Sequence, residues 1–250
     1  MGGNVLGQVL AVVSGKGGTG KTSLCAGVAC ALAAEGQSVL CIDADMGLRN
    51  LDISLGMTQD PAIPFTTVMR GEYTLSDAAV HPDFSKLRFL TAPVTETAET
   101  LDTEMFRRFL SDARAAFDWV LIDAPAGVGA GFQVSVRFAD LAMVVTGGEP
   151  AALRDGARTA QALEQHSTAQ AGIVVNRIRR KFFRQTRSTV DDCMDIIGLP
   201  LLGIVPEDPM VPLAAAVGKP LLGQTKKAAA MACIHIARRL CGVKQPLLKL

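Results

Sequence analysis

The sequence lacks three features that would place the protein in or beyond a membrane. No apolar run in its 250 residues approaches the roughly 18 to 20 that a membrane-spanning helix needs. Its start has no basic segment followed by an apolar stretch, because Lys16 already lies in a charged, glycine-rich loop. Leu6 stands where N-myristoylation requires Ser or Thr. We therefore expect neither a membrane-spanning protein nor a secreted precursor.

The sequence also has little excess charge and no paired cysteines. Twenty-five Lys and Arg face 24 Asp and Glu, a net charge of +1, which argues against a uniformly basic nucleic-acid binder. The six cysteines form no CxxC pair and stand mostly in apolar stretches, so we expect buried free thiols in a reducing cytoplasm. The three histidines are far apart in the sequence and predict no metal site.

The composition is that of a folded protein with a large core: 49% of the residues are hydrophobic and 20% are charged. No internal repeat, low-complexity tract or linker divides the chain. We expect one domain over residues 1–250, ending in a short tail at 243–250. The stretch 56–75, with Pro61, Pro64 and Gly71, is interpreted as an excursion over the surface.

Short apolar runs alternate with longer helical stretches along the whole chain. The apolar runs are nearly continuous, as expected for strands that are buried on both faces. This pattern predicts an α/β fold with a mostly parallel, twisted sheet covered by helices on both faces. We expect strands at 8–13, 38–43, 87–91, 119–123, 141–146, 171–176 and 201–206, and helices at 20–35, 101–116, 131–138, 150–165, 186–197 and 225–241.

A phosphate-binding loop follows the first predicted strand. Residues 15–22 satisfy GxxxxGK[ST] and lead directly into a predicted helix, which is the context such a loop requires. Glycines let backbone N–H groups face a phosphate, and the helix N-terminus adds partial positive charge. Lys21 would contact the β- and γ-phosphates, and the Thr22 hydroxyl would bind Mg²⁺. The predicted ATP contacts in this segment are Gly15, Lys16, Gly17, Gly18, Thr19, Gly20, Lys21, Thr22 and Ser23.

Aspartates follow two other predicted strands. Asp43 and Asp45 end the strand 38–43, and Asp123 ends the strand 119–123. A single acidic residue after a strand is more often a helix cap or a turn residue. In a parallel sheet, however, these carboxylates would converge near the phosphate loop, where they could hold metal-bound water and orient an attacking water. Three of them beside a phosphate loop favour this second interpretation.

The loop carries an additional lysine, Lys16, and with it resembles the MinD/ParA family of P-loop ATPases, whose Walker A motif is deviant in this way. In that family the signature lysine reaches across a homodimer to the partner's nucleotide, so the resemblance implies ATP-driven dimerisation. The likeness covers about residues 8 to 245. It includes two switch segments (43–52 and 123–127) and further matches at 144–146, 153–155, 174–178, 202–208 and 236–240.

The resemblance also implies residue roles. Lys16, Lys21, Asp45 and Asp123 would be catalytic, with Asp45 serving hydrolysis. Thr22, Asp43 and Asp123 would hold Mg²⁺, the aspartates through water. Asn176 and Asp208 would hydrogen-bond adenine, and Arg177 and Pro206 would complete the ATP site. The chain departs from the family at 127–131, which is unusually rich in glycine, and in its tail, which is too short for an amphipathic membrane helix.

Within the family the chain most resembles members that determine the septum site. This implies a slow, partner-stimulated ATPase that binds Mg²⁺, a division inhibitor of the MinC type, a stimulating or topological partner and the membrane surface. Its place would be cytoplasmic or peripheral on the inner face of the cell membrane. Two alternatives stay open: a ParA-like DNA-partition or flagellar-placement ATPase, and a nucleotide-gated scaffold with negligible hydrolysis. The basic cluster at 177–187, with Phe182 and Phe183, is either a solvated face or a contact for nucleic acid or anionic lipid.

Overall fold

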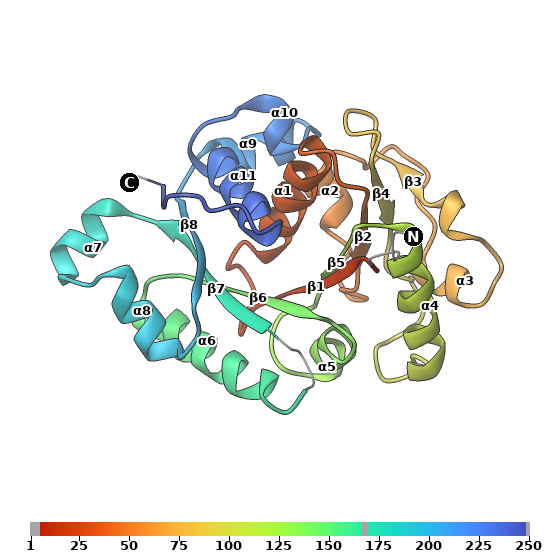
Figure 1. The fold of residues 1–250 in the computed structure, drawn as a ribbon, viewed down its shortest axis with the longest axis horizontal. Coiled ribbons are helices and arrows are strands. Elements are labelled where there is room, and N and C mark those ends of the chain that lie inside the picture. Colours follow the sequence, from red (N-terminus) through yellow and green to blue (C-terminus); the bar gives the residue numbers. More distant parts are fainter. Residues whose placement is uncertain (1–5, 167–169, 249–250) are drawn as a thin grey trace, which may run out of the picture.

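One eight-stranded sheet organises the protein. The computed structural model describes residues 6–166 and 170–248, and Figure 1 shows its sheet and helices. Every predicted strand is confirmed, with ends that differ by at most two residues. In spatial order the strands are β3 (Ala79–Val80), β4 (Leu87–Leu90), β2 (Val39–Asp43), β5 (Trp119–Asp123), β1 (Gln8–Val13), β6 (Leu141–Thr146), β7 (Gln170–Ile178) and β8 (Leu201–Pro206).

The sheet is parallel except at one edge. β3 pairs antiparallel with β4 through Ala79 and Val80. This strand was not predicted, because two residues are too short to show a strand period and Val80 is half-exposed. All other pairings are parallel, so the carboxyl ends of β1, β2 and β5 lie along a single edge. That edge carries the phosphate loop.

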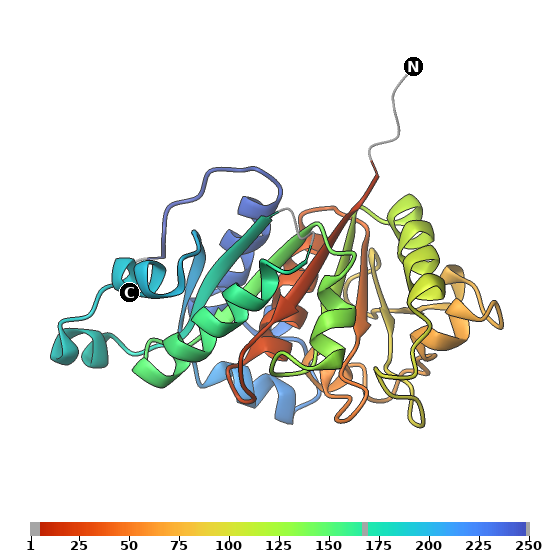
Figure 2. The ribbon, with the colours of Figure 1, turned by 90° about the horizontal axis from the view of Figure 1, so that it is seen from below.

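Helices cover both faces of the sheet, as predicted (Figures 1 and 2). Along β1, Leu10 and Val12 join one core layer while Val9, Ala11 and Val13 join the other, which explains the continuous apolar runs. The first layer contains α1 (Lys21–Ala34), α2 (Leu51–Leu55), α9 (Met210–Ala216), α10 (Leu221–Gln224) and α11 (Ala228–Leu240). The second contains α3 (Phe65–Met69), α4 (Thr103–Ala116), α5 (Ala130–Val136), α6 (Pro150–Leu163) and α8 (Val190–Ile197).

Local signals set the ends of several helices. Gly36 and Gly242 have φ values of 93° and 78° just past α1 and α11, a left-handed conformation that glycine adopts without strain. The Asp102 carboxylate accepts hydrogen bonds from the backbone amides of Glu104 and Met105, both at 2.9 Å, and so caps α4. These ends agree with the predicted ones to within three residues.

The helix predicted at 186–197 is wrong in its first part. Residues 187–189 are not helical: α7 (Arg180–Thr186) ends just before Arg187, which has a φ of 54°, and α8 begins at Val190. Thr189 starts α8 through a capping box, in which its hydroxyl and the Asp192 carboxylate each bond the other residue's backbone amide. Three members of the basic cluster, Arg180, Lys181 and Arg184, therefore lie on a short helix of their own.

The stretch 56–75 is not only a surface excursion. It contains α3, whose Phe65 is fully buried and contacts Phe106 and Phe109 with ring centroids 6.0 and 6.3 Å apart. A short 3₁₀ turn, Leu75–Asp77, follows it. Like α2, α9 and α10, α3 has too few turns to show a helical period in the sequence, so these elements were missed.

The tail beyond α11 packs on the edge strand β8. Arg239 donates from Nη1 to the Leu202 carbonyl at 2.7 Å and from Nη2 to the Gln245 carbonyl at 2.9 Å. Leu248 packs against both core layers, whereas Leu247 stays 46% exposed. No helix within 6–166 and 170–248 is long and apolar enough to span a bilayer. All six cysteines are free and five are buried, with Cys241 exposed.

His81 joins β3 to α2 from a buried position. Its Nε2 donates to the Leu55 carbonyl at 2.9 Å, and its Nδ1 accepts from the Asp83 amide at 3.0 Å. We assign the neutral Nε2–H tautomer, because only that form satisfies both contacts. Burial lowers the pKa of His81 below its ordinary value. The neutral ring therefore stabilises the end of α2.

We expect the stability of the nucleotide-free protein to fall between pH 7 and pH 5 through His81. Below its ordinary pKa of 6.5 the unfolded state takes up a proton that the folded state resists, so acid favours unfolding. His81→Gln should cost about 1 kcal/mol at pH 7, and its stability should then decline less with acid than that of the parent. Urea unfolding at both pH values measures this, and equal declines in the two proteins would exclude the role.

Candidate nucleotide site

The site lies where β1, β2 and β5 end. In the register of β2 and β5, Asp43 is paired directly with Asp123, and Val12 of β1 is paired with Asp123 on the other side. The loop between β1 and α1 lies against these ends, and α1 begins at Lys21. The structure thus brings the strand-end carboxylates and the phosphate loop together.

Glycines shape the phosphate loop in two ways. Gly18 and Gly20 have φ values of 79° and 87°, and a side chain on Gly20 would collide with the Asn176 amide. Apart from their chain neighbours, Gly17 and Gly18 have no heavy atom within 4 Å of where a Cβ would stand, so the space on that side of the loop is open. In the described structure the Thr19 hydroxyl is buried without a hydrogen-bond partner. An open cradle beside an unpaired hydroxyl fits the phosphates of a nucleotide.

Lys21 and Asp123 form a buried ion pair. Lys21 Nζ lies 2.7 Å from Asp123 Oδ1, and the two side chains are 6% and 1% exposed. Burial raises the pKa of Asp123, and the positive charge of Lys21 acts against this rise. The Thr22 hydroxyl lies 3.5 Å from Lys21 Nζ. The ammonium is therefore held at the start of α1, beside the open cradle.

Asp43 organises the segment that follows β2. Its carboxylate accepts from the backbone amides of Asp45 at 2.9 Å and Leu51 at 3.2 Å. Burial raises its pKa to about 7, with the charge of Asp123 adding to the rise and the two amides acting against it. Asp45 is only half-buried. Of the two aspartates, Asp43 thus fixes the backbone of the switch segment, while Asp45 is the one more open to solvent.

Lys16 stands apart from the buried groups. Its side chain is 48% exposed, and its Nζ lies 4.0 Å from Asp155 Oδ2 on α6. A contact of this length between exposed groups contributes little to stability. Gly15 approaches the backbone of Asp155 so closely that a Cβ would collide with it. The loop therefore rests on α6 and presents Lys16 outward.

A cavity of about 500 Å³ opens beside the loop at the carboxyl ends of β7 and β8. Six of the predicted ATP contacts line or adjoin it: Gly20, Ser23, Asn176, Arg177, Pro206 and Asp208. The rest of its lining carries no signal in the sequence. It is mostly apolar and comes largely from the short helices α9 and α10 and from α11. These residues are Leu24, Val205, Glu207, Pro209, Val211, Pro212, Ala215, Leu221, Ala229 and Cys233. An apolar slot with a few polar groups suits a flat heterocycle.

Asn176 and Asp208 hold the walls of this cavity together. Asn176 Nδ2 donates to the Thr19 carbonyl at 2.8 Å, which ties β7 to the phosphate loop. Asp208 accepts from the Met210 amide at 2.9 Å and from the Ala229 amide at 3.1 Å, which joins the starts of α9 and α11. These hydrogen bonds fix the positions of both side chains and leave the Asn176 side-chain oxygen and the remaining lone pairs of Asp208 to accept from a ligand. Their role as adenine contacts stays a prediction.

The glycine-rich segment after β5 has a defined shape. Gly127 has a φ of 87°, and its amide donates to the Ser14 carbonyl at 2.9 Å. Gly131 lies so close to the Pro125 ring that a Cβ would collide with it. At two of its glycines, 127 and 131, conformation or packing therefore requires the absence of a side chain. Val128, between them, is 45% exposed.

Comparison with known proteins agrees with this geometry. Residues 10–221 match the model of the CobQ/CobB/MinD/ParA nucleotide binding domain. The septum site-determining protein MinD of Synechocystis is 35% identical over 244 residues, which cover 96% of this chain and 92% of that protein. The fold of MinD in the MinC:MinD cell division complex of Aquifex aeolicus matches with a TM-score of 0.89 at 33% identity, over 97% of this chain and 98% of that one.

A further solved structure bears on the ligand. The MinD of Pyrococcus horikoshii, described as complexed with Mg-ADP, matches with a TM-score of 0.81 at 28% identity, over 94% of this chain and 96% of that one. The likeness in sequence and in fold thus extends over nearly the whole chain. The protein belongs to the CobQ/CobB/MinD/ParA family of nucleotide-binding proteins and resembles its MinD members.

Proposed function

We propose that the protein is an ATPase of the MinD type, which dimerises on binding ATP and regulates where the cell divides. The observation that supports this best is the pairing of a buried Lys21 with an outward Lys16 in one phosphate loop. The first suits binding within the subunit and the second suits contact with another subunit. The full-length likeness to septum site-determining proteins supports the cellular role.

Binding would use the loop and the adjoining cavity together. Around Gly17 and Gly18 the structure leaves open space, where phosphate oxygens would accept hydrogen bonds from backbone amides of the loop. Lys21, which Asp123 holds at the start of α1, would contact the β- and γ-phosphates. The adenine would enter the apolar slot between β8, α9 and α11, near Asn176 and Asp208.

Hydrolysis would depend on the carboxylates at the strand ends. Mg²⁺, when bound with the nucleotide, would neutralise charge on the phosphates. Thr22 would hold this ion directly, and Asp43 and Asp123 through water; this donor set suits Mg²⁺, which retains several waters. Asp45, half-buried at the end of β2, would orient the attacking water.

Nucleotide exchange would act as a conformational switch. ATP must favour the dimer through contacts that ADP cannot make, and Lys16 with the segments 43–52 and 123–127 would supply them. Such a site turns over slowly until a partner completes it. A division inhibitor of the MinC type and a protein that stimulates hydrolysis are the expected partners, and the dimer would bind the inner face of the membrane.

The test is phosphate release by an Asp45→Ala protein. We expect turnover at least 100-fold below that of the parent, with ATP still bound, because the attacking water loses its orienting carboxylate. Asp112→Ala, an exposed aspartate on α4 outside both switch segments, is the control and should turn over normally. Phosphate release at background by the parent itself, with vesicles, a MinC-type protein and a stimulating partner present, would instead indicate a scaffold without hydrolysis.

A further inference from the structure

The helix α7 gathers positive charge on one face. At 100° per residue, Arg180, Arg184 and Lys181 fall within about 100° of the helix circumference, and Gln185 continues this face. These four side chains line a single open hollow on the surface. Phe183 lies on the other face, against Gly148 and the core. Packing of Phe183 thus fixes the orientation of α7 and directs the cations outward.

Most of these charges are not neutralised by the protein itself. Arg179, just before α7, forms a two-pronged ion pair with Glu207 at 2.6 and 2.7 Å. Within residues 6–166 and 170–248 Arg180, Lys181 and Arg184 are all exposed and form no ion pair. No acidic residue occurs between Arg177 and Val190. Three exposed like charges on one helix face repel one another, so this face suits a partner that supplies many negative charges.

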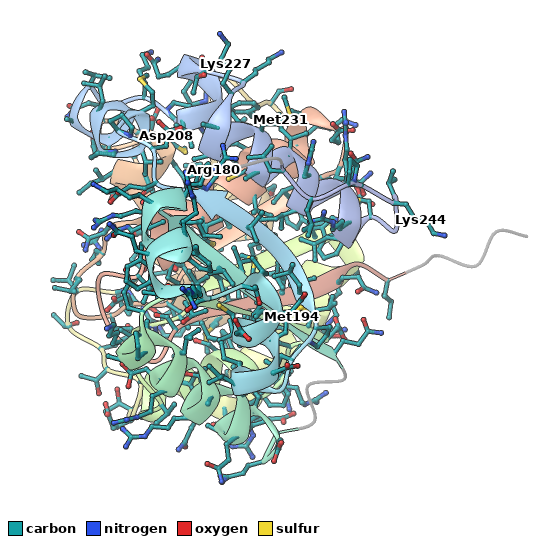
Figure 3. The ribbon with its side chains drawn as sticks, turned by 90° about the vertical axis from the view of Figure 1, so that its left-hand side faces the viewer. Arg180, Met194, Asp208, Lys227, Met231 and Lys244 are labelled. Atoms are coloured by element: carbon teal, nitrogen blue, oxygen red, sulfur yellow. The ribbon has the colours of Figure 1, made fainter. Side chains whose placement is uncertain are left out.

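The place of α7 in the fold narrows the choice of partner. It projects from the end of β7 beyond the edge strand β8 (Figures 1 and 2). The chain returns to this same edge, where Leu248 packs and Leu247 remains exposed. Figure 3 faces this side of the molecule and labels Arg180 on α7 and Lys244 in the tail. Cations and an exposed leucine thus share one end of the protein.

We propose that the α7 face, Arg180, Lys181, Arg184 and Gln185, binds the phosphate headgroups of an anionic bilayer. This inference rests on the proposed membrane binding and identifies the surface that supplies it. A weak apolar contact such as the tail needs a second, electrostatic contact to hold a protein on a membrane. The neighbouring α8 presents the exposed carboxylates of Asp191 and Asp195, so the contact is confined to α7. A near-neutral protein with one such face suits a flat anionic surface better than wrapped DNA.

Glu207 connects the nucleotide pocket with the start of this face. Glu207 lines the pocket and holds Arg179, the residue before α7. Arg177, at the end of β7, lines the same pocket. A nucleotide bound in this pocket would therefore lie beside Glu207, whose partner Arg179 directly precedes the lipid-binding face. A dimer would carry two such faces.

The experiment is co-sedimentation of the full chain with vesicles of phosphatidylcholine, alone or with phosphatidylglycerol, in ATP and Mg²⁺ or in ADP. Arg180→Gln with Arg184→Gln removes two cations from the face. Lys226→Gln with Lys227→Gln, on exposed residues just before α11, removes the same charge as a control; Figure 3 labels Lys227 at the top of the view, above Arg180. Each cation near such a surface contributes about fivefold in binding, so we expect the α7 variant to bind anionic vesicles about 25-fold more weakly.

The control should bind like the parent, and vesicles without phosphatidylglycerol should bind all three proteins equally weakly. If the α7 variant bound anionic vesicles in ATP as strongly as the parent, the inference would be wrong, but the proposed function would not be affected. A parent that binds no vesicle in either nucleotide would overturn both. If the parent and the control bound duplex DNA and the α7 variant did not, while all three bound vesicles equally, the face would be assigned to nucleic acid instead.

Discussion

Replacing Lys21 with Ala is expected to abolish useful ATP binding and to weaken the fold at the same time. The Lys21 ammonium is held at the start of α1, where the phosphates would bind, and truncating one partner of a buried charge contact costs about 2 to 5 kcal/mol, or roughly 30- to 4,000-fold in affinity. Its loss also leaves Asp123, 1% exposed, without its cation, which should destabilise the protein by about 3 to 5 kcal/mol. Titration with a fluorescent ATP analogue and urea unfolding measure the two effects.

A second variant separates the two consequences. Lys21→Met with Asp123→Asn removes both charges and leaves a neutral pair of similar size, so most of the lost stability should return. ATP affinity should stay low, because neither replacement carries a positive charge. If the double variant bound ATP like the parent, Lys21 would not be a phosphate contact; if Lys21→Ala were as stable as the parent, the ion pair would add nothing to the fold.

The parts of the fold that the sequence predicted are those with a long, regular pattern. Strands such as Val39–Asp43, buried on both faces, appear as continuous apolar runs. The helix α1 could be predicted because a phosphate-binding loop of this pattern leads directly into a helix. The parts that were missed are short. α3, α9 and α10 have seven residues or fewer, and their formation depends on what they pack against, as Phe65 does on Phe106 and Phe109.

The candidate site divides in the same way. The phosphate loop and the three strand-end aspartates could be identified from residue type and order, because a parallel sheet brings its strand ends together. The apolar wall of the nucleotide cavity could not, since Val211, Leu221 and Cys233 reach it from helices that only the tertiary structure places there. The dual use of Asp208, which joins two helix starts, also has no signal in the sequence.

The arrangement of charges suggests why two lysines share one loop. Lys21 is buried and its charge is already compensated by Asp123, so it can serve binding in the monomer. Lys16 has only a 4.0 Å contact with Asp155, which leaves its charge available. The phosphate loop therefore carries one lysine whose charge is compensated within the subunit, Lys21, and one whose charge is not, Lys16. This difference predicts different consequences for replacing each of them.

Replacing Lys16 with Ala is expected to leave ATP binding within a few-fold of the parent while keeping the protein monomeric. The side chain is 48% exposed and lies outside the buried pair, so its loss should disturb neither the loop nor Asp123. In the dimer its charge would meet the partner's nucleotide across a desolvated interface, where truncating one charge costs about 2 to 5 kcal/mol. The dimer constant should then weaken by roughly 30- to 4,000-fold.

Light scattering with a non-hydrolysable ATP analogue and Mg²⁺, over a range of protein concentrations, measures that constant. Asp155→Ala is the matched control: it removes the weak contact of Lys16 within its own subunit, so it should dimerise at least as readily as the parent. A Lys16→Ala dimer as tight as the parent's would exclude a role across the interface. Loss of ATP binding in the monomeric variant would instead place Lys16, with Lys21, on the nucleotide of its own subunit.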